Sequence, residues 1–331
     1  MMNSEFLDGV LLRRRAALKA LAALSAAAVT PAALAKKSED VERFDYSDPY
    51  DNVYAFGKVW AGYGAPQYGA YHGIMYGRAG GKRHKPLFGY TGTGVMQARI
   101  NSDRSVSIRG KETGFFTDLA TGDILEEWLN PYTGERVKPF NFLNEVGATL
   151  TAEMPKYAFG KPDDEPTLMN KGSLQAGADT IPFLLPFENY GDDLLFTWDY
   201  AHGYTNPVTR EKWPKASTGV KISPSEHFTF RVSKSELEDR SIPSSRFVAG
   251  FTRVSEWWPW MKMGGHKYQD GIIFGRMHSH KGLPGYQDLP PRLLAYLEKN
   301  YPEYLEVPAD WNPRKPAGTW EKYAAEVAPE V

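Results

Sequence analysis

Short runs of alternating apolar and polar residues, separated by turn-forming residues, fill most of the chain between Asn52 and Ser279. Successive side chains of a strand point to opposite faces, so alternation with a period of two predicts half-buried strands. The predicted strands are residues 53–60, 71–76, 88–99, 105–116, 124–130, 137–142, 194–200, 227–232, 247–256 and 271–277. Strands joined by short turns pair antiparallel, so we expect a mainly β fold with one curved sheet or a barrel.

Helical periodicity is limited to residues 233–240, 291–299 and 320–327, which follow Ser, Pro or Thr start signals. Two of these segments are C-terminal, and the Pro- and Gly-rich stretch between them indicates a surface strap. We therefore expect a β-sheet or barrel domain at residues 51–289, with residues 290–331 packed on it as helices and a strapping segment. Residues 36–50 are charged and turn-rich, which is typical of a flexible leader.

Residues 1–35 have the pattern of an export signal. A cationic stretch, Arg13-Arg14-Arg15-Ala16-Ala17-Leu18-Lys19, precedes an apolar run from Ala20, and Ala33-Leu34-Ala35 provides small residues for cleavage. The apolar run of about 14 residues is shorter than the ~20 that span a bilayer. The pattern predicts a twin-arginine signal, export by the twin-arginine machinery, a periplasmic or secreted location and no stable membrane anchor. A general secretory signal is the alternative, because Ala17 stands where the twin-arginine consensus prefers phenylalanine.

The composition and the absence of common motifs narrow the possible functions. The chain has no cysteine, which excludes disulfides, thiolate nucleophiles, iron–sulfur clusters and thiolate zinc sites. Its formal net charge is −1, and removal of the basic export segment makes the rest more acidic, which disfavours a nucleic-acid partner. Nine tryptophans, all beyond residue 35, supply core burial and can line a pocket for an apolar ligand. Residues 89–94 indicate a tight turn, since they lack the glycine spacing of a dinucleotide-binding loop.

Five blocks of sequence, taken together and in order, carry a resemblance to a known family. The blocks are Lys111–Phe115, Asp118–Gly122, Glu127–Gly134, Trp258–Gly264 and Leu289–Pro291. They resemble a family of exported bacterial proteins catalogued only as a domain of unknown function, over most of the chain after the signal. The resemblance implies no activity and no catalytic residue. The sheet-rich pattern is similar to lipocalin-like barrels, a class that includes carriers and enzymes such as cyclases and hydratases.

Three charged residues lie on apolar faces of predicted strands. Glu112 alternates with Ile108 and Phe116, while Arg253 and Arg276 alternate with apolar residues of their own strands. A carboxylate on an inward face must be paired or functional. The three charges form either a ligand-orienting network, with Glu112 moving a proton and the arginines holding negative charge, or a structural lock between strands.

Asp199 is a second candidate for acid–base chemistry. It stands between Trp198 and Tyr200, and His202 follows closely. An Asp–His contact in a pocket of rings suits general acid–base catalysis. The alternative is that Asp199 caps its own turn before Gly203.

Aromatic residues near these candidates are expected to hold a substrate. The candidates are Trp128, Trp198, Tyr200, Trp258 and Trp260. The last two belong to the connection Trp257–Gly264, which either closes a pocket mouth as a lid or packs against the end of the sheet.

His278 and His280 form the candidate metal site, because alternate residues of a strand present their side chains on one face. A metal needs further ligands. The candidates for these are His202, His227, Asp199 and Glu226. Lys281 and Gly282 follow at once, so the alternative is a polar strand end in solvent.

These patterns favour an enzyme that acts on a small apolar or aromatic molecule by cofactor-free acid–base chemistry, as a lyase, hydratase, isomerase or cyclase. Glu112 or Asp199 would move a proton, and Arg253 and Arg276 would hold developing negative charge. One alternative is a carrier that binds a lipid or aromatic ligand without changing it. Another is a metal-dependent oxygenase or hydrolase that uses His278 and His280.

Overall fold

The computed structural model describes residues 44–155, 180–201, 203–312 and 318–331, and the predicted export signal lies outside these ranges. The described chain is mainly β, as the sequence predicts. Its elements, in chain order, are α2 (Pro49–Trp60), β1 (Gln67–Arg78), β2 (Lys85–Ile100), β3 (Val106–Thr117), β4 (Trp128–Leu129), β5 (Arg136–Val137), β6 (Phe142–Leu150), β7 (Glu153–Pro155), β8 (Thr180–Pro182), β9 (Glu188–Tyr190), β10 (Asp193–Ala201), β11 (Tyr204–Thr205), β12 (Lys221–Ile222), β13 (Ser225–Ser233), α3 (Lys234–Glu238), β14 (Phe247–Glu256), η2 (Pro259–Met261), β15 (Ile272–Leu283), η3 (Tyr286–Asp288), α4 (Pro291–Asn300), η4 (Pro302–Leu305) and α5 (Thr319–Glu326).

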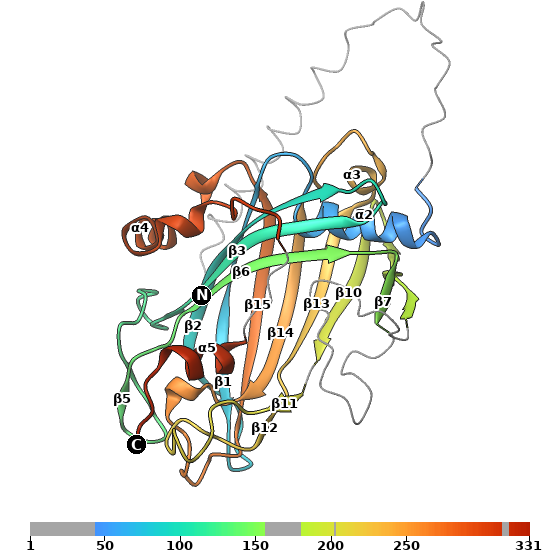
Figure 1. Cartoon of the computed structure of the whole chain (residues 1–331). Coiled ribbons are helices and arrows are strands. Elements are labelled where there is room, and N and C mark those ends of the chain that lie inside the picture. Colours follow the sequence, from blue (N-terminus) through green and yellow to red (C-terminus); the bar gives the residue numbers. More distant parts are fainter. Residues whose placement is uncertain (1–43, 156–179, 202, 313–317) are drawn as a thin grey trace, which may run out of the picture. The chain divides into compact units, whose positions relative to one another are not determined.

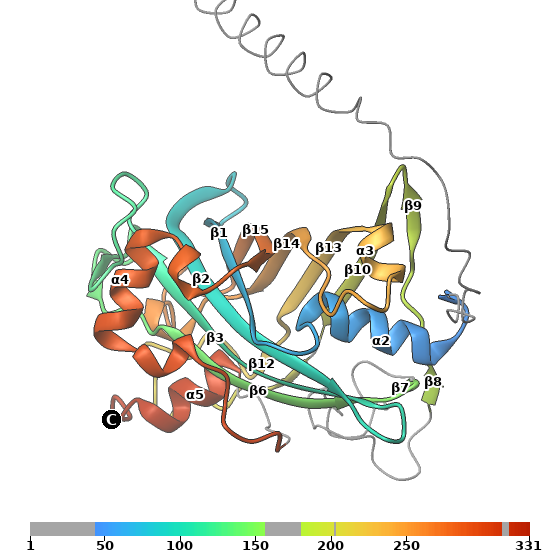
Figure 2. The ribbon, with the colours of Figure 1, turned by 90° about the horizontal axis from the view of Figure 1, so that it is seen from above.

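Within the described residues, nine strands form one antiparallel sheet in the order β6-β3-β2-β1-β15-β14-β13-β10-β9. The sheet curves strongly, so that β6, β3 and β2 form one wall and β14, β13 and β10 form another (Figure 1, Figure 2). Its edges β6 and β9 do not pair with each other in the described part of the chain. The expectation of a curved antiparallel sheet is therefore confirmed, and the lipocalin-like closed barrel is not found.

Helix α2 lies between the two walls of the sheet (Figure 2). The prediction of a strand over residues 53–60 is wrong. Asp48 caps the helix by accepting a hydrogen bond from the Tyr50 backbone N–H at 3.0 Å. Val53 and Phe56, three residues apart, are both buried on the helix face that meets the sheet. The spacing of three is helical, and with the capping signal it outweighs the β-branched residues that suggested a strand.

Two buried lysines hold α2 against its neighbours. Lys58 Nζ donates hydrogen bonds to the carbonyl oxygens of Leu237 at 3.1 Å and Asp239 at 2.6 Å. Lys281 Nζ, from β15, donates to the carbonyl oxygen of Lys58 and to Ser244 Oγ, each at 2.8 Å. Burial lowers the pKa of Lys58 to about 8 and that of Lys281 to about 7.

The described end of the predicted leader packs against this helical region. Phe44 is buried, and its ring lies 4.8 Å from the ring of Tyr46. The Tyr46 hydroxyl donates a hydrogen bond to Glu238 at 2.7 Å. Aromatic side chains in the leader therefore add to the core beside α2.

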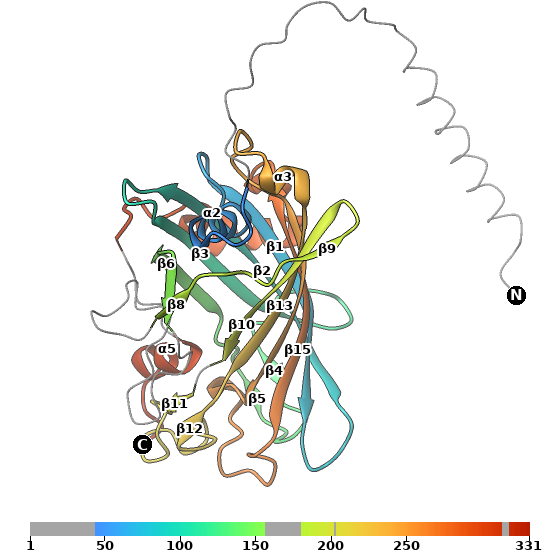
Figure 3. The ribbon, with the colours of Figure 1, turned by 90° about the vertical axis from the view of Figure 1, so that its right-hand side faces the viewer.

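The convex face of β1 and β3 is covered by C-terminal elements. Leu293 and Leu297 of α4 and Leu305 of η4 form a cluster with Ala70 and Phe115 of these strands. The predicted C-terminal helices are confirmed as α4 and α5. None of the helices in the described ranges combines the length and apolarity needed to cross a bilayer. In the described part of the chain, no helix covers the convex side of β15, β14 and β13 in this way (Figure 3).

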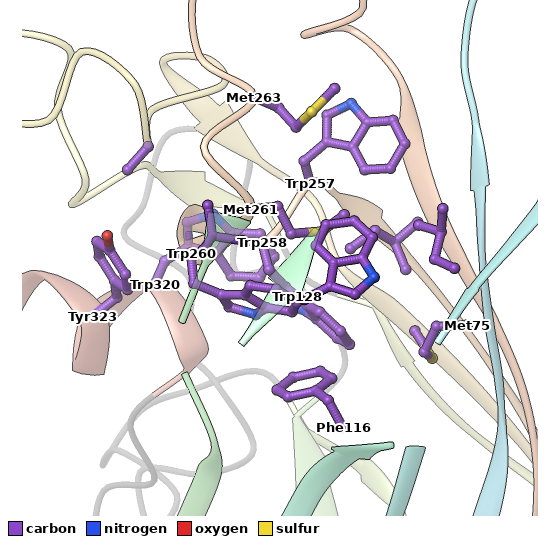
Figure 4. Packing of buried hydrophobic residues seen from close by; sticks show 14 of the residues in the cluster. Met75, Phe116, Trp128, Trp257, Trp258, Trp260, Met261, Met263, Trp320 and Tyr323 are labelled. Carbon is purple, nitrogen blue, oxygen red and sulfur yellow. The ribbon is translucent and has the colours of Figure 1, made fainter. Parts of the chain in front are cut away.

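The connection Trp257–Gly264 packs against one end of the sheet (Figure 4). The Trp260 ring lies 5.4 Å from Phe88, 4.8 Å from Phe116 and 5.6 Å from Trp128, measured between ring centroids. Trp260 is only 1% exposed. These distances describe a packed aromatic cluster. Of the two alternatives for this connection, a lid or packing against the end of the sheet, the structure has the second.

Truncating the centre of this cluster should destabilise the fold. We expect Trp260→Ala to lower the free energy of unfolding by about 3–5 kcal/mol, because a large buried ring is replaced by a cavity. Leu129→Ala is the control, since Leu129 is 54% exposed, and its effect should stay within about 0.5 kcal/mol. Urea unfolding measures both. A loss below about 1 kcal/mol for Trp260→Ala would contradict the packing described.

Candidate functional site

The concave face of the sheet, α2 and the start of α5 enclose a cavity of about 630 Å³. Most of its wall is aromatic or aliphatic. Phe56 and Trp60 of α2, Phe228 and Phe251 of the sheet and Trp320 of α5 all line it, and the Trp60 and Phe228 ring centroids lie 6.0 Å apart. A cavity of this size and composition suits a small apolar molecule.

Glu112 is a polar group on this apolar wall. It lies on β3, where alternation places it on the concave face with Ile108 and Phe116. Asn144 of β6 is its direct cross-strand neighbour and hydrogen-bonds to its carboxyl group. Burial, together with the charge of Glu226, raises the pKa of Glu112 from the usual 4.5 to about 7. A carboxyl group with this pKa exchanges a proton readily near neutral pH.

Glu226 and Arg253 form an ion pair in the same cavity. They are cross-strand neighbours on β13 and β14, and their side chains are 26% and 20% exposed. The Arg253 guanidinium also lies 5.8 Å from the Trp258 ring centroid. Since Glu226 already neutralises Arg253, a ligand anion would have to compete with a neighbouring carboxylate.

Three tyrosines add neutral hydroxyls to the cavity wall. Burial raises the pKa of Tyr71, Tyr90 and Tyr200, the last to about 12. The Tyr71 hydroxyl donates a hydrogen bond to the carbonyl oxygen of Thr113 at 2.5 Å, and its ring lies 5.7 Å from that of Tyr90. All three hydroxyls stay protonated at neutral pH, and those of Tyr90 and Tyr200 can donate a hydrogen bond to a ligand oxygen.

The glycines at residues 89–94 belong to the interior of β2, so the predicted tight turn is wrong. A Cβ on Gly92 would collide with the Tyr71 ring, and one on Gly114 of β3 would collide with the Tyr90 hydroxyl. The glycines are there because aromatic side chains lie flat across the strands.

Five of the nine predicted catalytic and substrate-binding residues line the cavity, and four do not. Glu112 and Arg253 both line it. So do three of the predicted substrate-binding residues, which are Trp198, Tyr200 and Trp258. Trp128 and Trp260 are not among the lining residues and pack in the aromatic cluster at the sheet end.

Asp199 and Arg276 lie on the convex face, away from the cavity. Asp199 pairs with His227 at 3.1 Å, where both side chains are more than half exposed. Arg276 is exposed and lies 5.3 Å from the Phe274 ring centroid. The interpretation of Arg276 as inward is wrong because β15 buries the other set of alternate residues, including Ile273 and Met277.

His278 and His280 share this convex side of β15, which continues to Leu283 instead of ending in solvent. The ring of His278 lies 6.2 Å from that of His72 on β1. The described residues contain no group of three or more His, Asp or Glu side chains placed to hold a metal ion. His202, one of the proposed ligands, lies outside the described residues.

The sequence did not identify Glu226, Asn144, Tyr71 and Tyr90 as members of one site. Glu226 carries a usable signal, because it precedes the predicted strand 227–232 by one residue and alternates with Phe228 and Phe230. Asn144 lies on β6, most of which was not predicted.

The sequence and the structure were compared with known protein families, curated proteins and solved structures. A family model described as "Protein of unknown function (DUF1838)" matches residues 65–327, which include Glu112, Glu226 and Arg253. No curated protein matches the chain. A solved structure described as "Crystal structure of MucB in complex with MucA(peri)" is similar at 9% identity, covering 72% of this chain and 94% of that chain, with a TM-score of 0.12. A TM-score this low supports no argument about fold or function.

The raised pKa of Glu112 predicts a pH-dependent contribution to stability. Between pH 4.5 and about 7 the folded chain holds a proton that the unfolded chain releases. The stabilisation that this proton provides is therefore fully present below the pKa of Glu112 in the unfolded chain. It is lost as pH rises through the pKa in the folded chain, and the free energy of unfolding falls by ~3 kcal/mol over this range. In Glu112→Gln this loss should be absent.

Urea unfolding of wild type and Glu112→Gln at about pH 5 and about pH 8 tests this linkage. The free energy of unfolding of Glu112→Gln minus that of the wild type should increase by ~3 kcal/mol from the lower to the higher pH. Lys58 and Lys281 have lowered pKa values, which make stability rise with pH. Their contributions are the same in both proteins and cancel in this difference. An unchanged difference would contradict the burial of Glu112.

Proposed function

The chain belongs to the family described as "Protein of unknown function (DUF1838)", and from the cavity we propose that it is an enzyme acting on a small apolar or aromatic molecule by cofactor-free acid–base chemistry. The observation that carries this proposal is that two carboxyl groups in different environments line the same aromatic cavity. Glu112 has a pKa near neutrality, while Glu226 is paired with Arg253. Carboxyl groups in such different environments are the usual arrangement for an acid and a base.

The residues have distinct roles in the proposed reaction. For the loss of water from a ligand, protonated Glu112 donates its proton to the leaving hydroxyl, and the C–O bond breaks to release water. A carboxylate takes a proton from the adjacent carbon, and the C–H electron pair forms the double bond. Glu226 is the candidate for that base, and a hydratase would run the steps in reverse.

The tyrosines and aromatic rings position the ligand in this proposal. Tyr90 and Tyr200 are neutral donors that can hold a hydroxyl or carbonyl oxygen, while Tyr71, whose proton goes to the Thr113 carbonyl, can accept a hydrogen bond from a ligand hydroxyl. The rings of Trp198 and Trp258 exclude water from the reacting atoms. Asp199 and Arg276 have no role in this scheme because they lie on the opposite face.

We further propose that the protein works after export, in the periplasm or outside the cell. The twin-arginine pattern of residues 1–35 supports this location.

A non-catalytic carrier is the second candidate function. The cavity of about 630 Å³, with its mostly apolar wall, favours it. A carrier would retain a lipid or aromatic ligand through purification and release it unchanged. Native mass spectrometry of protein from its native host, followed by analysis of the extracted ligand, distinguishes the two functions.

Replacing Glu112 should separate catalysis from binding. With a phenolic or terpenoid substrate found by screening purified protein, we expect Glu112→Gln to lower kcat about 10²–10⁴-fold, because the amide cannot transfer the proton. Arg276→Ala is the matched control, since Arg276 is an exposed charge on the convex face of the same sheet. Turnover measured by chromatography should be unchanged in this control. Equal turnover in wild type and Glu112→Gln would overturn the assigned role.

A further inference from the structure

Glycines surround Glu112 on the concave face of β1, β2 and β3, and most of them have a structural explanation. Those at Gly92 and Gly114 make room for tyrosine side chains. At Gly110 a Cβ would collide with Met96, and at Gly69 it would come within 2.8 Å of the carbonyl oxygen of residue 280. At Gly92, Gly110 and Gly114 other side chains fill the space, whereas at Gly69 the close contact is with the neighbouring main chain, and Gly69 still lines the cavity.

Gly94 is different. A Cβ there would have its nearest contacts at 3.7 Å from Met96 Cε and 3.9 Å from Glu112 Cγ, which are ordinary van der Waals distances. Its φ is not positive, so the backbone does not require glycine either. Gly94 keeps accessible surface and lines the cavity. The protein leaves this space open beside Glu112.

The strand register extends this open space into a strip. Across the sheet, Asn144, Glu112, Gly94, Gly69 and Lys281 are successive partners on β6, β3, β2, β1 and β15. The two central positions have no side chain. Because neighbouring strands are about 4.8 Å apart, the bare main chain next to Glu112 is about as wide as a ring. Lys281 closes the far end, with its Nζ engaged outside the strip.

We propose that the main chain of Gly94 and Gly69 is the floor of a substrate subsite, which takes a flat, uncharged ring bearing a hydroxyl or carbonyl oxygen directed at Glu112. This subsite rests on the proposed function of the cavity and narrows its substrate class. We call these two residues the glycine floor.

The shape and charge of the surroundings define the ligand. Glycine in a strand lets a ligand approach the backbone closely, and a flat ring gains the most contact from a bare peptide plane. Met96 and Tyr71 stand beside the floor on the same face and limit its width. An anionic ligand is disfavoured, because Glu226 already neutralises Arg253 and an anion would lie beside the carboxyl group of Glu112.

The test uses 2-naphthol, a flat neutral ring with one hydroxyl, bound to the mature protein and measured by calorimetry at neutral pH. Gly94→Val fills the space over the floor, and we expect it to weaken 2-naphthol binding about tenfold or more. Gly250→Val is the matched control, because Gly250 lies in β14 with its Cβ position open, but on the exposed convex face. This control should change the Kd less than about twofold. Thermal unfolding checks that both variants are folded.

The glycine floor would be overturned if Gly94→Val bound 2-naphthol as tightly as the wild type does, or if Gly94→Val and Gly250→Val lost affinity equally. It would also be overturned if the wild type did not bind 2-naphthol, or if it bound 2-naphthoate more tightly than 2-naphthol. The proposed chemistry is read separately from turnover in Glu112→Gln. Lost turnover there, with intact binding in Gly94→Val, would reject the floor and retain the enzyme. Lost binding in Gly94→Val, with no turnover in any variant, would retain the floor and reject the enzyme.

Discussion

A strongly curved sheet with an apolar concave face must cover that face from water, and the rest of the structure follows from how it does so. Helix α2 covers one end, held by Lys58 and Lys281, and the Trp257–Gly264 connection packs against the other. The cavity remains between them, lined by Trp60 of α2 and by Trp258 of the connection. Glu112 and the three tyrosines lie there among aromatic rings, and burial raises their pKa values for that reason.

The sequence predicted the parts of this arrangement that depend on local pattern. Alternation along β3 correctly placed Glu112 with Ile108 and Phe116, and β14 has the predicted bounds. The same reasoning failed on β15, where both faces carry apolar residues: Phe274 is partly buried on the convex side and Met277 is buried on the concave side. Parity does not choose a face when both are apolar, so Arg276 was assigned to the wrong one.

The tertiary features of the site had no local signal. Glu226 affects the pKa of Glu112 because curvature brings β13 to face β3, and curvature is a property of the whole sheet. Gly92 suggests a turn because glycine usually interrupts strands, while Gly114 lies within a predicted strand. Their role becomes clear only when the Tyr71 and Tyr90 rings are seen to lie over them. Gly94 belongs to the same stretch of sequence, yet only the structure shows that nothing of the protein fills its space.

The pairing of β1 with β15 has a consequence for how the domain forms. The two strands lie near opposite ends of the chain, and each is the other's neighbour in the middle of the sheet (Figure 1). Pairing of β1 with β15 closes a loop of about 200 residues. The chain loses conformational entropy when this loop closes, and that loss precedes the joining of the two walls. During synthesis, the wall of β6, β3, β2 and β1 has no partner until the C-terminal strand emerges. The cavity is thus among the last features to form, and a chain interrupted before β15 would expose both unfinished walls as aggregation-prone edges.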